Sequence, residues 1–259
     1  MTTLANAPLI EVITELRWGK IFHPEGEGSI AFQFSEDERN FFPGQFKSEA
    51  KQRGFNFHEA VNPNIPLPHL VKHRFRREAN TWPCFQIGDG IFTVNQTNDG
   101  YAWNTYKDAF SEGLAVLDKS HPDTLEKLPL IGIELRYRDA FFLNEGESSA
   151  NFLHNKFNFA FVIPQKFLAS DSLEKEILNN NFSFAINSTA PVGIVVVDVK
   201  EAIINGKPGF IMDILIRSAD EKAPKSSSED LVGWLEKAHL MQKHAFKTLV
   251  KSDFAETFK

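Results

Sequence analysis

Two interleaved sets of positions mark the first predicted element, in residues 9–18. One set of alternate positions is apolar apart from a threonine, and consists of Ile10, Val12, Thr14, Leu16 and Trp18. The other set is charged apart from one isoleucine, and consists of Glu11, Ile13, Glu15 and Arg17. A period of two is typical of a β-strand with one face in the core and the other in water. The sequence therefore predicts a half-buried strand whose acidic side is exposed.

Further strands are predicted along the whole chain. The segments with strand-like patterns are residues 69–77, 84–88, 91–96, 128–143, 182–188, 193–205 and 209–219. A Gly-Asp-Gly turn between the second and third of these predicts a β-hairpin. The last three segments follow one another closely, which predicts an antiparallel meander.

Apolar residues at helical spacing predict two long helices. In residues 101–119, Trp103, Tyr106 and Phe110 recur at intervals of three and four, and residues 229–254 carry a similar stripe. Such a row of aromatic side chains is typical of a core-facing helix rather than of a platform for stacking bases. A helix that begins after Ser35 is divided by Pro43, and residues 172–180 predict a short helix.

Strand clusters that alternate irregularly with helices favour an α+β fold, with antiparallel sheet(s) packed against the two long helices. The length of 259 residues suits a single domain, 1–259. The order of a hairpin followed by a helix recurs, so two packed and topologically similar halves, 1–144 and 145–259, are an alternative organisation. No residue-level repeat accompanies this order.

Composition narrows the class of protein. The net charge of −6 argues against a general nucleic-acid binder, and the 25 phenylalanines leave room for an exposed partner-binding patch. Cys84 is the single cysteine, which excludes an internal disulfide and favours a reducing compartment. The N-terminal residues lack the features of a signal peptide, and no stretch reaches the roughly 18 apolar residues of a membrane span. We therefore expect a soluble cytoplasmic protein without a membrane contact.

Four ordered segments, residues 7–18, 85–110, 131–141 and 231–254, resemble a known family. It is a sporadically distributed prokaryotic family of uncharacterised proteins. Its members open with a Pro-Leu-x-Glu-Val strand, carry a hairpin that ends in Val-Asn before a Trp-x-x-Tyr helix, and close with a Trp-Leu-x-x-Ala-His helix. The resemblance implies no reaction. The patchy distribution implies defence-type gene neighbourhoods, where such proteins serve in multi-protein systems, so it favours partner binding.

The first strand supplies one candidate site. Glu11 and Glu15 share a strand face, and paired carboxylates can act as acid and base when they are buried. The interpretation that we favour is a solvated face with ion pairs to Arg136 or Arg138 on a neighbouring strand. Should a pocket exist between sheet and helices, Glu11, Glu15, Arg136 and His239 are its candidate residues.

The closing helix carries His239 and His244, five positions apart. This spacing places the two side chains about 140° apart around the helix axis, so a shared metal ion is not expected. We predict instead that His239 is packed and hydrogen bonded.

A basic segment is the sharpest local charge reversal in this acidic chain. Residues 69–77 include Lys72, Arg74, Arg76 and Arg77, and alternation predicts that the first three point to the same side. One interpretation is a groove for phosphates, RNA or an acidic partner. The alternative that we favour is a charged edge strand that blocks pairing with other sheets.

No motif in the sequence requires a cofactor or a metal. Phosphate-binding glycine loops and the zinc and nucleophile motifs are absent, and Cys84 is best explained as a small buried hydrophobe. This modestly disfavours an ordinary hydrolase or nucleotide-dependent enzyme.

Three hypotheses remain. The first is a non-enzymatic protein-binding or regulatory component, for example of a defence or toxin-neutralising system, with a protein partner or a homo-oligomer as its assembly. The second is an enzyme or ligand-binding protein with a pocket between sheet and helices. The third, which is not favoured, is recognition of RNA or a nucleotide through residues 69–77.

Overall fold

The chain folds around one large antiparallel sheet. The computed structural model describes residues 8–22, 31–62, 65–159, 164–170, 172 and 180–258. Nine strands lie in the order β4-β5-β6-β7-β1-β8-β11-β10-β9. They are β1 (Leu9–Trp18), β4 (Phe57–Ala60), β5 (Val71–Arg76), β6 (Cys84–Gly88), β7 (Ile91–Thr97), β8 (Leu130–Phe142), β9 (Asn181–Thr189), β10 (Val192–Ile204) and β11 (Lys207–Ala219). A separate ribbon pairs β2 (Lys20–Phe22) with β3 (Ala31–Gln33).

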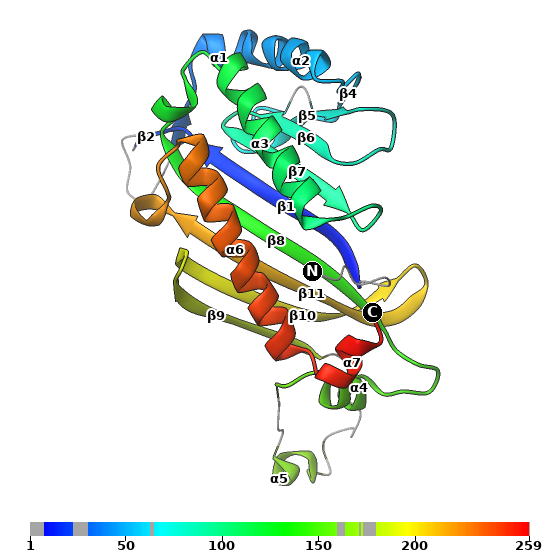
Figure 1. Ribbon diagram of the computed structural model, residues 1–259. Coiled ribbons are helices and arrows are strands. Elements are labelled where there is room, and N and C mark those ends of the chain that lie inside the picture. The colour runs from blue at the N-terminus through cyan, green and yellow to red at the C-terminus, as the bar shows by residue number, and fades with distance from the viewer. Residues whose placement is uncertain are drawn as a thin grey trace.

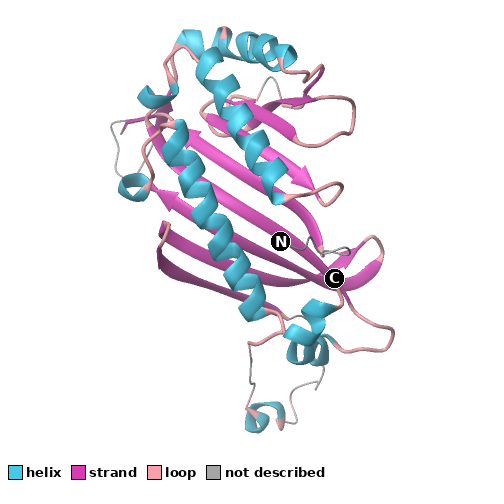
Figure 2. Ribbon diagram, in the orientation of Figure 1, coloured by secondary structure: helices cyan, strands magenta, loops and turns pink. Residues whose placement is uncertain are grey.

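The two long helices form a second layer on one side of the sheet, whereas α5 (Gln165–Leu168) projects beyond the lower end of the sheet in this view (Figures 1 and 2). The long ones are α3 (Trp103–Ser120) and α6 (Ser228–Leu249), which lie side by side. The others are α1 (Glu36–Asn40), α2 (Phe42–Gln52), α4 (Ser149–Lys156), α5 (Gln165–Leu168) and α7 (Ser252–Glu256), with single 3-10 turns at Leu125–Lys127 and Asp220–Lys222. The opposite side of the sheet carries no described helix, and we call it the open face.

Strand β1 in the middle of the sheet follows the predicted alternation. Val12, Leu16 and Trp18 are at most 1% exposed on the helix side, whereas Glu15 lies on the open face. The start of the strand departs from the pattern, because a register shift against β8 lies between Leu9 and Glu11. As a result Leu9 is buried and Ile10 is only half-buried.

The surplus of phenylalanine fills the space between sheet and helices. Ten phenylalanines are among the largest fully buried side chains: Phe42, Phe46, Phe55, Phe75, Phe85, Phe92, Phe110, Phe141, Phe152 and Phe157. Their rings pack mainly edge to face or tilted, as for Phe42 on Phe46 with centroids 5.8 Å apart. Much of the surplus predicted to be core is therefore core.

The α+β class and the antiparallel sheet are confirmed. The hairpin β6–β7, the meander β9–β10–β11 and the division of α1 from α2 near Pro43 also match the predictions. The prediction of two long helices is incomplete, because the structure also contains the helices α2 and α4. Two similar halves are not confirmed, because β8 and β11 pair directly and join both halves in one sheet. Among the described helices, none combines the length and the apolar character needed to cross a membrane.

Three element predictions need correction or lie outside the described residues. The basic strand β5 is not an edge strand, because β4 pairs along its outer side. The closing helix ends at Leu249 rather than at residue 254, because Val250 turns away to pair with Phe157. The short helix predicted for residues 172–180 lies almost entirely outside the described residues.

Candidate functional site

The centre of the open face is a network of arginines and carboxylates on three adjacent strands. The register places Glu15 of β1 opposite Glu134 of β8, and Glu134 opposite Arg217 of β11. Two carboxylates directly opposite each other repel, so this arrangement requires cations beside them. Arg17 of β1 and the arginines Arg136 and Arg138 of β8 are separated from these glutamates by even numbers of residues, so they lie on the same face of the sheet.

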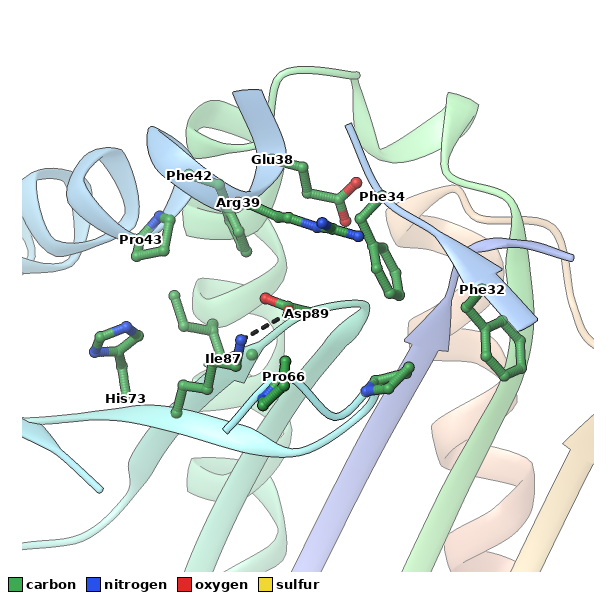
Figure 3. A pocket seen from close by; sticks show the side chains of 13 residues that line it. Phe32, Phe34, Glu38, Arg39, Phe42, Pro43, Pro66, His73, Ile87 and Asp89 are labelled. Atoms are coloured by element: carbon green, nitrogen blue, oxygen red, sulfur yellow. Dashed lines mark hydrogen bonds and ion pairs between the residues drawn. The ribbon is translucent and has the colours of Figure 1, made fainter. Parts of the chain in front are cut away.

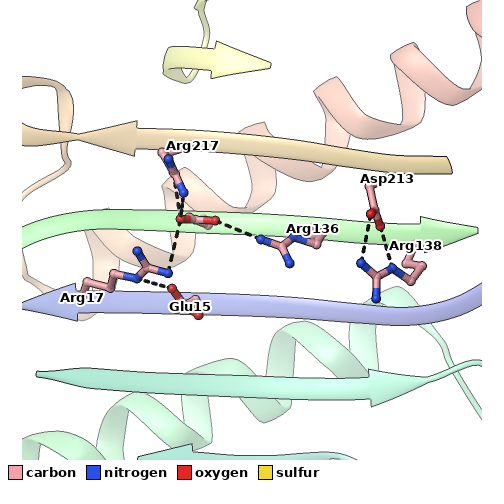
Figure 4. Close-up of polar contacts among 7 residues, drawn as sticks. Glu15, Arg17, Arg136, Arg138, Asp213 and Arg217 are labelled. Carbon is pink, nitrogen blue, oxygen red and sulfur yellow. Dashed lines mark hydrogen bonds and ion pairs between the residues drawn. The ribbon is translucent and has the colours of Figure 1, made fainter. Parts of the chain in front are cut away.

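Glu134 is the hub of this network, and Figure 4 shows the arginines that surround it, Arg17, Arg136 and Arg217. Its carboxylate accepts a hydrogen bond from the Arg217 guanidinium and lies 3.6 Å from Arg136 and 3.9 Å from Arg17. Arg17 also donates to Glu15. The side chain of Glu134 is 7% exposed, since the guanidinium groups lie around it.

A second pair extends the network along the strands. Arg138 binds the Asp213 carboxylate through two hydrogen bonds, of 2.8 and 3.0 Å. This bidentate geometry is the strongest form of an arginine–carboxylate contact, and it raises the pKa of Arg138. The four arginines Arg17, Arg136, Arg138 and Arg217 are each 37–39% exposed, so their outer N–H groups remain in contact with water.

Desolvation acts on Glu15 more strongly than its arginine neighbour does. Burial raises the pKa of this carboxyl above its usual range, the Arg17 guanidinium opposes the rise, and Glu134 adds to it. Glu15 nevertheless lies on the open face and has no histidine among its hydrogen-bond or ion-pair partners. This environment is that of a structural ion pair and not of a shared acid–base site.

Uncharged polar side chains continue the open face towards β6. Thr93 donates to Asn95, and Asn95 donates to the Glu11 carboxylate at 3.0 Å. Cys84 lies in the same region with no exposed surface, and burial raises the pKa of its thiol. The prediction of a buried, unreactive cysteine agrees with this position. Neither Glu11 nor Glu15 forms an ion pair with Arg136 or Arg138, which pair with Glu134 and Asp213, although Glu11 contributes to the raised pKa of Arg138.

The predicted basic group does not converge on one groove. Lys72 binds Asp89 at 2.7 Å, Arg74 and Arg76 share Glu59, and Arg77 binds Glu112 at 3.2 Å. The pairing of β5 with β6 has a register shift between Val71 and His73, so Lys72 departs from the alternation predicted for this strand. The side chain of Lys72 lines a cavity together with that of His73. The Cζ atom of Arg76 lies over the Trp82 ring, 5.2 Å from the centroid of that ring. Each cation is thus already paired with a carboxylate.

His239 lies on the other side of the sheet from Glu11, Glu15 and Arg136. Its ring stacks on Trp103 with centroids 3.7 Å apart, and its Nδ1 lies 2.9 Å from the Tyr137 hydroxyl. Burial lowers the pKa of His239 to about 4, so the ring is neutral at pH 7. The prediction of a packed, hydrogen-bonded histidine is confirmed, whereas the four pocket candidates do not meet in one pocket. His244, in contrast, is exposed.

A cavity of about 410 Å³ lies between α1, α2 and the strands β5 and β6 (Figure 3). Its apolar wall consists of Phe32, Phe34, Phe42, Pro43, Pro66, Pro68 and Ile87, and its polar lining includes Glu38, Arg39, Lys72, His73 and Asp89. Glu38 accepts a hydrogen bond from the Trp18 indole at 2.7 Å. Burial lowers the pKa of His73, so this ring is neutral at pH 7. None of the predicted pocket residues lines this cavity.

The described residues contain no group of three or more His, Cys, Asp or Glu side chains arranged to hold a metal ion. No protein-family model, curated protein or solved structure matches this chain. The class that the molecule itself defines is a two-layer α+β protein with one open, arginine-rich sheet face.

Sequence reasoning missed Glu134, Asp213 and Arg217. The sequence nevertheless contains a pattern that groups them. Glu134 and Arg136 are separated by an even number of positions in β8, and so are Asp213 and Arg217 in β11. Alternation therefore assigns each pair to one strand face. Their contacts also require the pairing of β8 with β11, which lie far apart in the chain.

Proposed function

We propose that the chain is a non-enzymatic binding protein that docks a protein partner on the open face of its sheet. The observation that carries the proposal is the set of four half-exposed arginines that carboxylates hold in place on a face without covering helices. Arginine is enriched in protein interfaces. Side chains that are already ordered lose less entropy on binding.

The chemistry of the face favours a partner that presents hydrogen-bond acceptors. Arg136 makes one ion pair, at 3.6 Å, and donates no hydrogen bond to a described residue, although its guanidinium carries five N–H groups. Leu215, which pairs with Arg136 across β8 and β11, adds a half-buried apolar contact beside it. The partner surface is therefore expected to carry carboxylates or carbonyls around a small apolar centre.

A photo-crosslinking experiment tests the position of the partner. A benzophenone amino acid replaces Leu215 on the open face or, as a matched control, Leu240, which is 59% exposed on α6. We expect one defined protein of the source cell to crosslink at position 215 and not at position 240. Crosslinking of the same protein at position 240 alone, or of no protein at either position, contradicts the proposal.

Charge reversal tests the arginines themselves. Arg136→Glu with Arg217→Glu is compared with Lys237→Glu and Lys247→Glu, an equal charge change at exposed positions of α6. Binding of the crosslinked protein should fall at least tenfold, about 1.4 kcal/mol, only in the open-face variant. Circular dichroism must show that both variants are folded. Equal binding by the two variants rules out the open face. A setting in defence or toxin neutralisation remains part of this hypothesis.

A small-ligand function is the second candidate, and the cavity below α1 and α2 supports it. Its volume lies in the range of ligand pockets, and its lining includes the exposed Arg39, which forms no ion pair with any described residue. A ring-containing carboxylate suits this combination of walls and cation. Benzoate should raise the melting temperature more than benzamide does, and Arg39→Gln should abolish the difference. Equal effects of both compounds exclude an anion site.

A further inference from the structure

The two edges of the sheet are built differently. At one end, β4 has four residues, and its Glu59 binds Arg74 and Arg76 of the next strand. At the other end, β9 has nine residues, Asn181–Thr189, and contains neither a charged residue nor a proline. Within the described residues β9 pairs only with β10 (Figure 1).

Strand β9 lacks the features that protect an edge from pairing. Natural sheets protect exposed edges with charges, prolines, bulges or short strands. The pairing of β9 with β10 runs without a register shift from Thr189↔Val192 to Asn181↔Lys200, so no bulge distorts this edge. Every second residue of such a strand directs its N–H and C=O groups away from its neighbour.

An exposed apolar side chain accompanies the backbone groups that no described strand pairs. Ile186 lies opposite Val195, which is buried on the helix side, yet Ile186 itself is 60% exposed. The side chain of Ile186 is therefore left uncovered, although Phe182 and Phe184 on the same face pack against the core. A long, uncharged edge with an exposed isoleucine is a surface that a second strand would cover.

We propose that a second copy of the chain pairs with β9, antiparallel, about a two-fold axis that passes beside Ala185. A strand without charges meets its own copy without like-charge repulsion, and antiparallel pairing continues the pattern of every described strand pair in this sheet. Full overlap of Asn181–Thr189 places its central residue, Ala185, opposite Ala185 of the second copy.

This register matches side chains on both faces. On the helix side, Phe184 lies opposite Ile186 of the second copy, and on the open side Ser183 lies opposite Asn187 of the second copy. The pairing forms about eight to ten backbone hydrogen bonds, the number in a typical protein interface. Since such an axis is perpendicular to the sheet, both open faces point to the same side.

The oligomeric state tests the edge. Light scattering after gel filtration should report a dimer for the wild type and a monomer for Ile186→Lys, which places a charge on the edge. The matched control is Ile203→Lys, also an exposed isoleucine, at 73%, beside the β10–β11 turn. It should remain dimeric. A wild type that is monomeric at about 100 μM, or an Ile186→Lys variant that is dimeric, overturns the proposal.

A cysteine scan tests the axis. The natural Cys84 is buried, so an introduced cysteine provides the accessible thiol. Ala185→Cys should form an intermolecular disulfide under mild oxidation, because the two Cα atoms lie within disulfide range. Asn181→Cys is the control for the register. Residue 181 of the second copy lies at the opposite end of the paired strands, so this variant should not form a disulfide. Equal crosslinking at both positions, or none at position 185, contradicts this axis.

Discussion

Asp139 is a buried acid on the helix side of β8. It is 4% exposed, and its Oδ2 accepts no hydrogen bond from any described residue. Burial raises the pKa of this carboxyl to about 7, and the Asp213 carboxylate adds to the rise. The folded state therefore retains a proton that the unfolded state loses near pH 4, and the core accommodates the neutral acid better than the anion.

This pKa fixes the direction of a pH effect on stability. Because the folded pKa is raised, the contribution of Asp139 is fully present below about pH 4 and is lost as the pH rises towards 7. In the wild type, ionisation of Asp139 should therefore lower the free energy of unfolding by at most about 4 kcal/mol as the pH rises. Urea titration of the Asp139→Asn variant at each pH should not show this fall. Asp108→Asn, at an exposed position of α3, is the control and should keep the wild-type slope. An identical slope in both variants contradicts the assignment.

Single residues also show where local pattern fails. The alternation of β1 correctly placed Glu11 and Glu15 on the solvent side, because alternation depends on the strand alone. Lys72 was placed wrongly, because a bulge depends on the partner strand. The sequence pattern separates His239 from the carboxylates once one considers that a helix packs on the apolar face of a half-buried strand, which is opposite to Glu11 and Glu15.

At the scale of elements, α3 lies unusually close to the sheet at Gly113. A Cβ built on this glycine would lie 2.6 Å from the Phe92 ring and 3.2 Å from the Phe85 ring. Helix α6 contains Gly233, and a Cβ built there meets no atom within 4 Å. The two helices thus contain glycine for different reasons, and only the one in α3 is required by packing.

Alanine substitution separates these two reasons. Gly233→Ala should stabilise the protein by up to about 1 kcal/mol, because alanine has the higher helix propensity. Gly113→Ala should destabilise it by about 1–3 kcal/mol despite the same gain, since the methyl group displaces Phe92. Thermal and urea unfolding of both variants provide the measurement. Equal stabilisation by the two substitutions would show that α3 can move away from the sheet.

Most elements were predictable, whereas their order in the sheet was not. β1, β8, β11 and α3 have clear periods, and the turns that bound the hairpins are local sequence features. The neighbours of β1 in the sheet are β7 and β8, which follow it by more than 70 residues. Such pairing depends on how whole faces match, and the periodicity of one strand does not encode it.

At the scale of the molecule, one sheet and one cluster of buried side chains join both ends of the chain. β8 pairs with β1 on one side and with β11 on the other, so no strand boundary separates residues 1–144 from 145–259. Leu135 and Ile216, which pair across β8 and β11, are both fully buried in this cluster. We therefore expect the chain to unfold as one unit.

Tryptophan fluorescence can test this cooperativity. Trp18, Trp82 and Trp103 lie in the first segment and Trp234 lies in the second. A Trp234→Phe variant should report the same urea midpoint by fluorescence as by far-ultraviolet circular dichroism. The variant loses the hydrogen bond that Trp234 donates to Ser218, so its stability differs from that of the wild type. The comparison is therefore between two probes of the same variant. Separate midpoints would restore the two-halves alternative.

Hydrogen–deuterium exchange distinguishes docking on the open face from pairing at the sheet edge. On the open face the backbone amides of β1, β8 and β11 already bond to neighbouring strands, so a protein docked there covers side chains and changes amide exchange little. A strand added at β9 would instead occupy amides that pair with no described strand. The free protein should therefore exchange alternate β9 amides quickly, and only assembly at that edge should slow them.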